Sequence, residues 1–257
     1  MRIALIGAGN LATHLGKALH KAGYEIVCVF SRTEESAKNL SSILKCRYTT
    51  DIKEVDKDAD IYISAIKDSA FHEIAPELIK DRENSLFLHT AGSLPMDIWS
   101  GYAKRYGVIY PMQTFSKSKE VDFTVIPLFL EANSKDDLSL IRTIAEQLSD
   151  RVYDASSEQR RYLHIAAVFA CNFSNHMYAI CDELLQRNGI PFDVMLPLID
   201  ETAAKVHKLK PIDAQTGPAI RYDENVINGH LSMLENDKDI KDIYEAISKS
   251  INKFSRK

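Results

Sequence analysis

The sequence predicts an α/β fold in which a doubly wound, mainly parallel sheet is followed by a smaller all-α domain. Two observations support this prediction. Apolar segments of strand length alternate with segments of helical periodicity through residues 1–154, and this alternation is typical of a parallel sheet covered by helices on both faces. After residue 154 only helical patterns follow. The predicted domains therefore cover residues 1–154 and 155–257.

Each element of the first half follows from an apolar run bounded by turn residues. The first strand, residues 2–6, precedes a glycine-rich turn, and the helix after it, residues 11–22, ends at Gly23. Further strands are expected over residues 25–30, 47–51, 60–66, 85–90, 108–111, 124–131 and 151–153. Further helices are expected over residues 33–44, 70–80, 96–106 and 135–148.

The second half begins with a clear helix start. Ser156 and Gln159 have the spacing of a capping box, in which each side chain bonds the backbone of the other residue. The helix continues to about residue 188, where Gly189 and Pro191 end it. Further helices are expected over residues 192–209, 223–234 and 237–254, with a loop over residues 210–222.

Bulk composition is that of an ordinary globular protein. The chain of 257 residues has 45% apolar and 26% charged residues and a formal net charge of −4, so we expect no nucleic-acid or membrane partner. Its four cysteines are scattered, which indicates reduced thiols and a cytoplasmic location. We expect no metal site. The opening strand leaves no room for a signal peptide, and no apolar run is long enough to span a bilayer.

The turn after the first strand has the pattern GxGxxA. Gly7 permits a tight turn, Gly9 lets the backbone approach a pyrophosphate, and the small Ala12 lets the helix pack closely on the strand. The helix N-terminus attracts the anion. The alternative is a tight turn without a ligand. The strand–turn–helix setting favours a Rossmann-like dinucleotide site, with these expected cofactor contacts: Gly7, Ala8, Gly9, Asn10 and Leu11.

The end of the second strand indicates which dinucleotide binds. An NAD site usually has an acidic residue there, whereas this chain has Ser31, Arg32 and Thr33. A guanidinium and two hydroxyls suit a 2′-phosphate, so we predict NADP(H). Glu34 and Glu35 belong to the first turn of the next helix, where acids are favoured anyway. The alternative for Arg32 is a solvated surface arginine.

The next strand ends are expected to line the nicotinamide side, because ligands bind at the carboxyl ends of parallel strands. Ala65, Ile66 and Lys67 follow one strand, and His89 and Thr90 end the next. His89 is either a catalytic proton donor or a loop histidine without a role.

The segment over residues 164–176 is apolar nearly all round, which predicts a buried helix. Its polar residues therefore need partners or a ligand. On a regular α-helix Asn175 lies about 20° from His164, and Asn172 about 80° away, so the three side chains share one face. We interpret His164 as a proton donor and Asn172 as a catalytic group that orients the substrate or the nicotinamide. Asn175 is an expected substrate contact, and the alternative is bonding across packed helices or to a dimer partner.

The loop before the third helix of the second half is a second candidate for substrate binding. Backbone N–H groups and the hydroxyl at Thr216 and Gly217 suit a carboxylate, and Arg221 supplies a nearby charge. The alternative is a turn in which Arg221 pairs with Asp223 or Glu224.

Six segments together carry a family resemblance: GAGNLA at 7–12, SRT at 31–33, HTAGS at 89–93, YPMQTF at 110–115, HIAAVFACNF at 164–173 and QTGPAIRYD at 215–223. With them the chain resembles, over nearly its whole length, the NADP oxidoreductases with a Rossmann-like N-terminal domain and a C-terminal helical domain of unknown function. Distantly similar families are pyrroline-5-carboxylate reductase, deazaflavin-dependent NADP oxidoreductase, and the 3-hydroxyisobutyrate and 6-phosphogluconate dehydrogenases.

The resemblance implies a reductase or dehydrogenase whose C-terminal domain, similar to that of 6-phosphogluconate dehydrogenase, binds substrate and forms a homodimer. Tyr110 and Gln113 are implied substrate contacts. The family usually has a histidine where this chain has Tyr110, and tyrosine titrates far higher than histidine. The hydroxyacid dehydrogenases have a lysine four residues before an asparagine. Here Val168 precedes Asn172 at that spacing, so their lysine relay is absent.

The resulting hypothesis is an NADP(H)-dependent oxidoreductase that transfers hydride to or from a small carbonyl or imine substrate. Two alternatives remain open. The first is a non-catalytic NADP-binding redox sensor, and the second is an enzyme that passes hydride between NADP and a deazaflavin.

Overall fold

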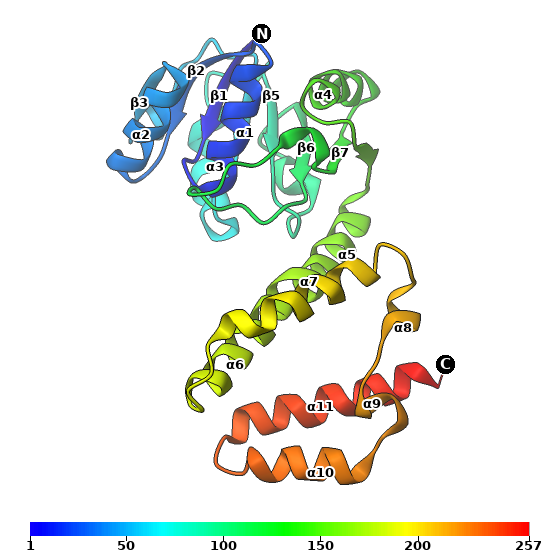
Figure 1. Cartoon of the computed structure of the whole chain (residues 1–257). Helices are drawn as coiled ribbons and strands as arrows, with labels where there is room; N and C mark the ends of the chain where they lie inside the picture. The colour runs from blue at the N-terminus through cyan, green and yellow to red at the C-terminus, as the bar shows by residue number, and fades with distance from the viewer. Residues whose placement is uncertain (257) are drawn as a thin grey trace. The chain divides into compact units, whose positions relative to one another are not determined.

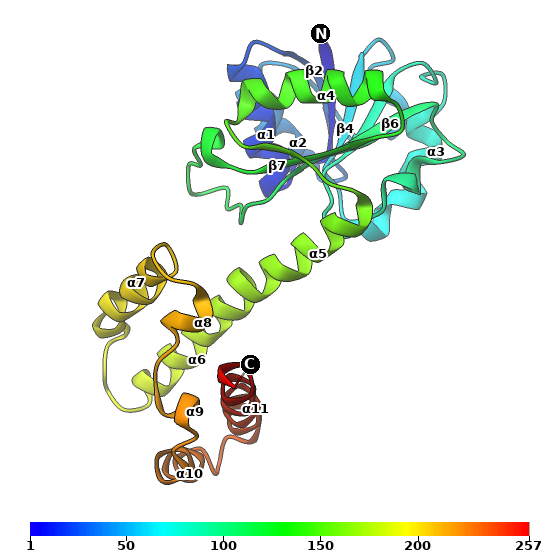
Figure 2. The same cartoon turned by 90° about the vertical axis from the view of Figure 1, so that its right-hand side faces the viewer.

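The computed structural model describes residues 1–256 and divides them into two compact units. The first unit covers residues 1–172 and the second begins at residue 173. Figures 1 and 2 show that the sheet belongs to the first unit and that the second is entirely helical. The expected α/β class, with helices alone after the last strand, is confirmed. The functional domain assignment at residue 154 stays a prediction.

The first unit contains an eight-stranded sheet whose strand order is β3-β2-β1-β4-β5-β6-β7-β8. All neighbouring pairs are parallel except β6 and β7, which are antiparallel. The order reverses between β1 and β4, which is the switch point where doubly wound sheets bind ligands. The strands are β1 (Arg2–Ile6), β2 (Glu25–Phe30), β3 (Arg47–Thr49), β4 (Ile61–Ser64), β5 (Leu86–His89), β6 (Arg105–Pro111), β7 (Leu128–Ala132) and β8 (Val152–Asp154).

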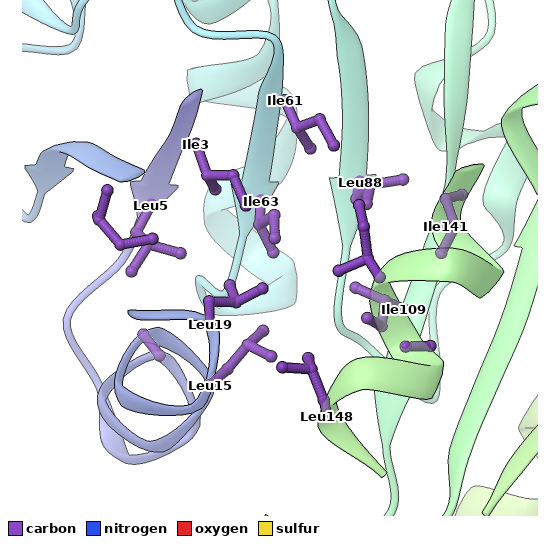
Figure 3. Close-up of a cluster of buried hydrophobic side chains, with 14 of the residues drawn as sticks. Ile3, Leu5, Leu15, Leu19, Ile61, Ile63, Leu88, Ile109, Ile141 and Leu148 are labelled. Carbon is purple, nitrogen blue, oxygen red and sulfur yellow. The ribbon is translucent and has the colours of Figure 1, made fainter. Parts of the chain in front are cut away.

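Helices cover both faces of this sheet. Helices α1 (Asn10–Lys21), α2 (Glu34–Leu44) and α4 (Lys135–Leu148) lie on one face, and α3 (Phe71–Ile79) lies on the other with the buried Trp99. Figure 3 shows leucine and isoleucine side chains of α1 and α4 packed against the strands. Burial of these side chains stabilises the scaffold by about 1.5–3 kcal/mol each. This packed scaffold keeps the carboxyl ends of the paired strands β1 and β4 side by side.

Two expectations in this unit are wrong. The helix expected over residues 96–106 is a short 3-10 helix, η3 (Met96–Trp99), followed by a turn at Gly101. Gly101 adopts a φ of 85°, which does not continue a right-handed helix, so the chain turns and β6 begins three residues earlier than expected. The strand expected from residue 124 begins at Leu128, after the 3-10 helix η4 (Phe123–Val125).

The long helix begins as predicted, because the capping box of Ser156 and Gln159 is present. It is not one regular helix, however. Helix α5 (Ser157–Ala167) passes into a π-helix, η5 (Val168–Phe173), and then into α6 (Ser174–Gln186). Of residues 157–186 only Arg160 is buried, so the prediction of a buried helix is wrong for the single chain.

After α6 the second unit continues with further helices and helical turns. Helices α10 and α11 lie side by side in Figures 1 and 2, and the Asn252 amide donates to the Ile220 carbonyl of α9 over 2.8 Å. The loop expected over residues 210–222 contains two helical turns. The elements are η6 (Phe192–Met195), α7 (Leu196–Lys205), α8 (Pro211–Ala214), α9 (Pro218–Arg221), α10 (Glu224–Met233) and α11 (Lys238–Ser255). Within residues 1–256, no helix combines the length and apolarity needed to span a bilayer.

Candidate active site

The glycine turn joins β1 to α1 and has two different requirements. Gly7 adopts a φ of 120°, and a β-carbon on it would lie 2.3 Å from the Ala65 carbonyl oxygen at the end of β4. Only glycine fits there, because the backbones of the two strand ends touch. A β-carbon on Gly9 would instead meet no atom within 4 Å. Gly9 therefore faces open space, as expected of a residue that a ligand approaches closely.

A hollow of about 310 Å³ lies over this turn. It brings together the glycine turn and the expected 2′-phosphate residues Ser31, Arg32 and Thr33. Thr33 is the N-cap of α2, and its side chain makes no capping hydrogen bond, so the N–H groups of that helix start remain available to an anion. Ala65, Ile66 and Lys67 line the same hollow, as do Ser36 and Lys117, which sequence reasoning missed.

A second, larger hollow of about 660 Å³ adjoins the first, because Ala65 and Ile66 line both. It lies entirely within the first unit. It collects predicted residues that lie far apart in the sequence: Leu11, Thr90, Tyr110, Gln113, His164 and Asn172. Its size is in the range of small-molecule sites, which span about 300–1,000 Å³.

Tyr110 and His164 meet at Gly92. A β-carbon on Gly92 would lie 2.8 Å from Cζ of Tyr110, 2.9 Å from its hydroxyl oxygen and 3.0 Å from Cβ of His164. The absence of a side chain at this residue therefore leaves room for the Tyr110 phenol and for Cβ of His164. Burial raises the pKa of the Tyr110 phenol, and the nearby Arg160 guanidinium opposes only part of that rise. Tyr110 thus stays protonated at neutral pH and presents an O–H donor.

His89 does not line the larger hollow. Its side chain is 1% exposed, and its Nδ1 accepts a hydrogen bond from the Ala91 N–H over 3.2 Å. Burial lowers the pKa of His89 to about 3, with a smaller contribution from the Arg160 charge. The imidazole is therefore neutral at pH 7 and lies outside the lining. This placement favours the alternative of a histidine without a catalytic role, and a proton-donor role for His89 stays a prediction.

Arg160 is a further residue beside the larger hollow that sequence reasoning missed. It is 0% exposed and donates to the carbonyl of Leu94 over 2.7 Å, to that of Ala91 over 3.2 Å, and to the Glu131 carboxylate. It thereby fixes the loop over residues 91–94, which contributes Gly92 to the larger hollow. No signal in the sequence marks this arginine as buried, because the charged residues Glu158 and Arg161 lie beside it at the start of α5.

The remaining predicted residues lie in the second unit and line neither hollow. The helical wheel that grouped Asn175 with His164 assumed a regular α-helix. The π-helix between them rotates the following residues by roughly 100° about the axis, so that grouping is wrong. Thr216 and Gly217 are exposed, and Arg221 has no ion pair with any residue in 1–256, including its proposed partners. The roles of all four in substrate binding stay predictions.

A metal site would need a group of side chains that could bind the ion. Residues 1–256 contain no group of three or more His, Cys, Asp or Glu side chains arranged to hold a metal ion.

Two family models match the chain. The model for coenzyme F420-dependent NADP oxidoreductases matches residues 2–91, and the domain of unknown function DUF2520 matches residues 126–251. A structure described as an NADP oxidoreductase from Bacteroides fragilis is 58% identical, with 98% of each chain covered and a TM-score of 0.94. No curated protein matches the chain.

More distant structures share the fold. An imine reductase from Myxococcus stipitatus in complex with NADP⁺ is 16% identical, with a TM-score of 0.68 over 100% of this chain and 93% of its own. A pyrroline-5-carboxylate reductase from Coxiella burnetii is also 16% identical, with a TM-score of 0.59 over 99% and 97%. The resemblance inferred from the sequence motifs is confirmed: the chain belongs to the NADP oxidoreductases in which an N-terminal domain of the F420-dependent type precedes a DUF2520 domain.

Proposed function

We propose that the protein transfers hydride between NADP(H) and a small carbonyl or imine compound. The observation that carries the proposal is the junction of two hollows at Ala65 and Ile66. One lies over the glycine turn, and the other has a mainly apolar lining that includes the polar side chains of the candidate substrate site. NADPH, when bound, supplies the hydride. The protein must then bind and orient the cofactor, hold the substrate beside it and supply a proton. The imine reductases of the same fold support an imine as one substrate class.

The proton donor in this proposal is His164, which lines the larger hollow from α5. The Tyr110 phenol beside it donates a hydrogen bond to the substrate oxygen or nitrogen, and its raised pKa keeps that donor protonated. Gln113 and Asn172 orient the substrate with amide groups. On the cofactor side, the Gly9 backbone faces the pyrophosphate and Arg32 pairs with the 2′-phosphate.

The first experiment is a fluorescence titration of wild type and Arg32→Ala with NADPH and with NADH. We expect wild type to prefer NADPH. Loss of a charge-assisted contact of about 1.5–3 kcal/mol should weaken NADPH binding roughly 10- to 100-fold in the variant. NADH is the internal control, because it lacks the 2′-phosphate and its affinity should change little. Failure of wild type to bind either nucleotide would overturn the proposal.

The second experiment separates an enzyme from a redox sensor. NADPH oxidation is followed at saturating cofactor with a panel of small imines and carbonyls, using wild type and His164→Ala. We expect turnover with at least one compound, and a lower kcat with unchanged NADPH affinity in the variant. Tight NADPH binding without turnover of any compound would favour the sensor instead.

Hydride exchange with a deazaflavin is the second candidate. The match of residues 2–91 to F420-dependent oxidoreductases favours it, and a hollow of about 660 Å³ has room for a ligand larger than a simple imine. Coenzyme F420 is therefore included in the same assay. Its reduction by NADPH, with no turnover of imines or carbonyls, would replace the first candidate by the second.

A homodimer through the helical half also belongs to this proposal. Several large apolar side chains there are exposed in the single chain: Tyr162 by 69%, Ile165 by 53%, Leu198 by 63% and Met233 by 83%. Exposed large apolar side chains are often covered in an oligomer, and a second copy of the chain would cover them. Light scattering should give twice the monomer mass, and Ile165→Glu should lower it. A cytoplasmic location stays a prediction made from the scattered cysteines of the sequence.

A further inference from the structure

The segment over residues 112–119, which we call the strap, runs from the end of β6 toward η4 and borders both hollows. Met112, Gln113 and Thr114 line the larger hollow, and Lys117 lines the smaller one beside the glycine turn. One short segment thus contributes side chains to the candidate substrate site and to the candidate cofactor site.

The strap is anchored on the first turns of α1. The Asn10 side-chain amide donates to the Phe115 carbonyl over 2.9 Å, and Nε2 of His14 bonds the Ser116 carbonyl over 2.9 Å. Because a carbonyl only accepts, this nitrogen of His14 carries the proton. The His14 ring also stacks on Phe115, with ring centroids 5.4 Å apart. These contacts hold Lys117 over the helix that begins at the glycine turn.

The smaller hollow is strongly cationic. Arg32, Lys67 and Lys117 line it, and no aspartate or glutamate does. None of the three has an ion pair with another of residues 1–256. Unpaired cations that converge on one hollow repel each other, so the arrangement is suited to a ligand with several negative charges. NADP(H) has that charge, with a pyrophosphate and a 2′-phosphate.

We propose that Lys117 is a phosphate ligand of the bound dinucleotide, held in place by the anchors of the strap on α1. The proposal rests on the cofactor site proposed above and adds a residue that lies far along the sequence from the glycine turn. Its ammonium group would pair with an oxygen of the pyrophosphate or of the 2′-phosphate. His14 is then a positioning residue, because it acts on the cofactor only through the strap.

Lys117→Ala is tested by titration with NADPH and NADH, with Lys119→Ala as the matched control. Lys119 is an exposed lysine on the same strap that does not line the cofactor hollow. We expect Lys117→Ala to weaken NADPH binding roughly tenfold and Lys119→Ala to bind as wild type does. An equal loss for NADH would assign Lys117 to the pyrophosphate, and a loss for NADPH alone would assign it to the 2′-phosphate. Unchanged affinity for both nucleotides would overturn the proposal.

His14→Phe tests the anchoring. Phenylalanine keeps a ring to stack on Phe115 but cannot donate to the Ser116 carbonyl. We expect weaker NADPH binding in this variant and no further weakening when it is combined with Lys117→Ala, because both changes remove the same contact. Full additivity would refute the positioning role. If wild type binds NADPH and Lys117→Ala binds it with the same affinity, only this inference is refuted. If wild type does not bind NADPH at all, the proposed cofactor site itself is refuted.

Discussion

Replacing Arg160 by methionine tests how the larger hollow is held together. The side chain is fully buried and bonds two loop carbonyls, the Ser157 hydroxyl and the Glu131 carboxylate. Methionine fills much of the same volume but removes every one of these donors. The loop over residues 91–94 then loses its attachment to α5, and Glu131 loses its cation.

The expected loss follows from these contacts. Breaking a buried ion pair costs about 3–5 kcal/mol when the remaining charge stays buried. The Glu131 side chain is 18% exposed, which lets water reach the carboxylate and favours the lower end of that range. The carbonyls of Ala91 and Leu94 each lose a donor, at about 1 kcal/mol apiece. We therefore expect Arg160→Met to lower the free energy of unfolding by about 3–5 kcal/mol.

Urea denaturation followed by tryptophan fluorescence reports on the unfolding of the first structural unit, which contains Arg160. The chain has one tryptophan, Trp99, which is fully buried in the first unit. With a urea dependence of 1–3 kcal/mol per molar, the midpoint should fall by more than about 1 M. Arg161→Met is the matched control, because Arg161 is exposed and should change the stability by less than about 0.5 kcal/mol. An Arg160→Met midpoint within error of that control would refute the reasoning.

Three further predictions follow from the glycines and from His89. Gly7→Ala should abolish folding, measured by circular dichroism, because its φ is 120° and its β-carbon would meet a carbonyl oxygen at 2.3 Å. Gly9→Ala should fold normally but lose NADPH affinity in a fluorescence titration. Normal NADPH binding by Gly9→Ala would contradict the proposed cofactor site. Gly92→Ala should lower the free energy of unfolding by about 1–3 kcal/mol and should also lower kcat, because the added methyl group overlaps the Tyr110 phenol. Gly229→Ala is the control: Gly229 lies in a helix with no atom near its β-carbon position, so kcat should not change. The folded pKa of His89, about 3, lies below its ordinary 6.5, so stability is complete above pH 6.5 and is lost as the pH falls toward 3. The free energy of unfolding should fall by about 2 kcal/mol between pH 7 and pH 5. His89→Asn keeps an acceptor for the loop N–H, and urea titrations of this variant should show a smaller fall. An unchanged fall would assign the pH dependence to other groups.

The cofactor half of the site could be predicted from the sequence because it depends on local backbone needs. Gly7 is required by its positive φ and by its contact with a neighbouring strand end, and Arg32 follows a strand whose end is visible in the apolar pattern. Residues adjacent to predictable strand ends are placed by the topology of the sheet alone. The same logic led to Thr90, which lines the larger hollow, whereas Tyr110 in that lining was singled out by the family resemblance.

The sequence was a weaker guide where rotation about a helix axis or burial mattered. His89 has the same local setting as Thr90 but points into the apolar layer beside Phe71 rather than toward the hollow. The polar face inferred for the long helix failed beyond Asn172, because a π-helix changes the number of residues per turn and no residue type announces it.

By itself, the sequence determined the fold class, the family and the position of the dinucleotide turn, since each can be recognised from short segments: apolar strands, helical periodicity and the glycine motif. Only the tertiary structure decided that Arg160 secures the loop of the larger hollow and that Lys117 faces the glycine turn about 110 residues before it. Both are charged side chains whose roles come from long-range contacts: one is matched by distant backbone carbonyls, and the other has no counter-charge until a phosphate arrives.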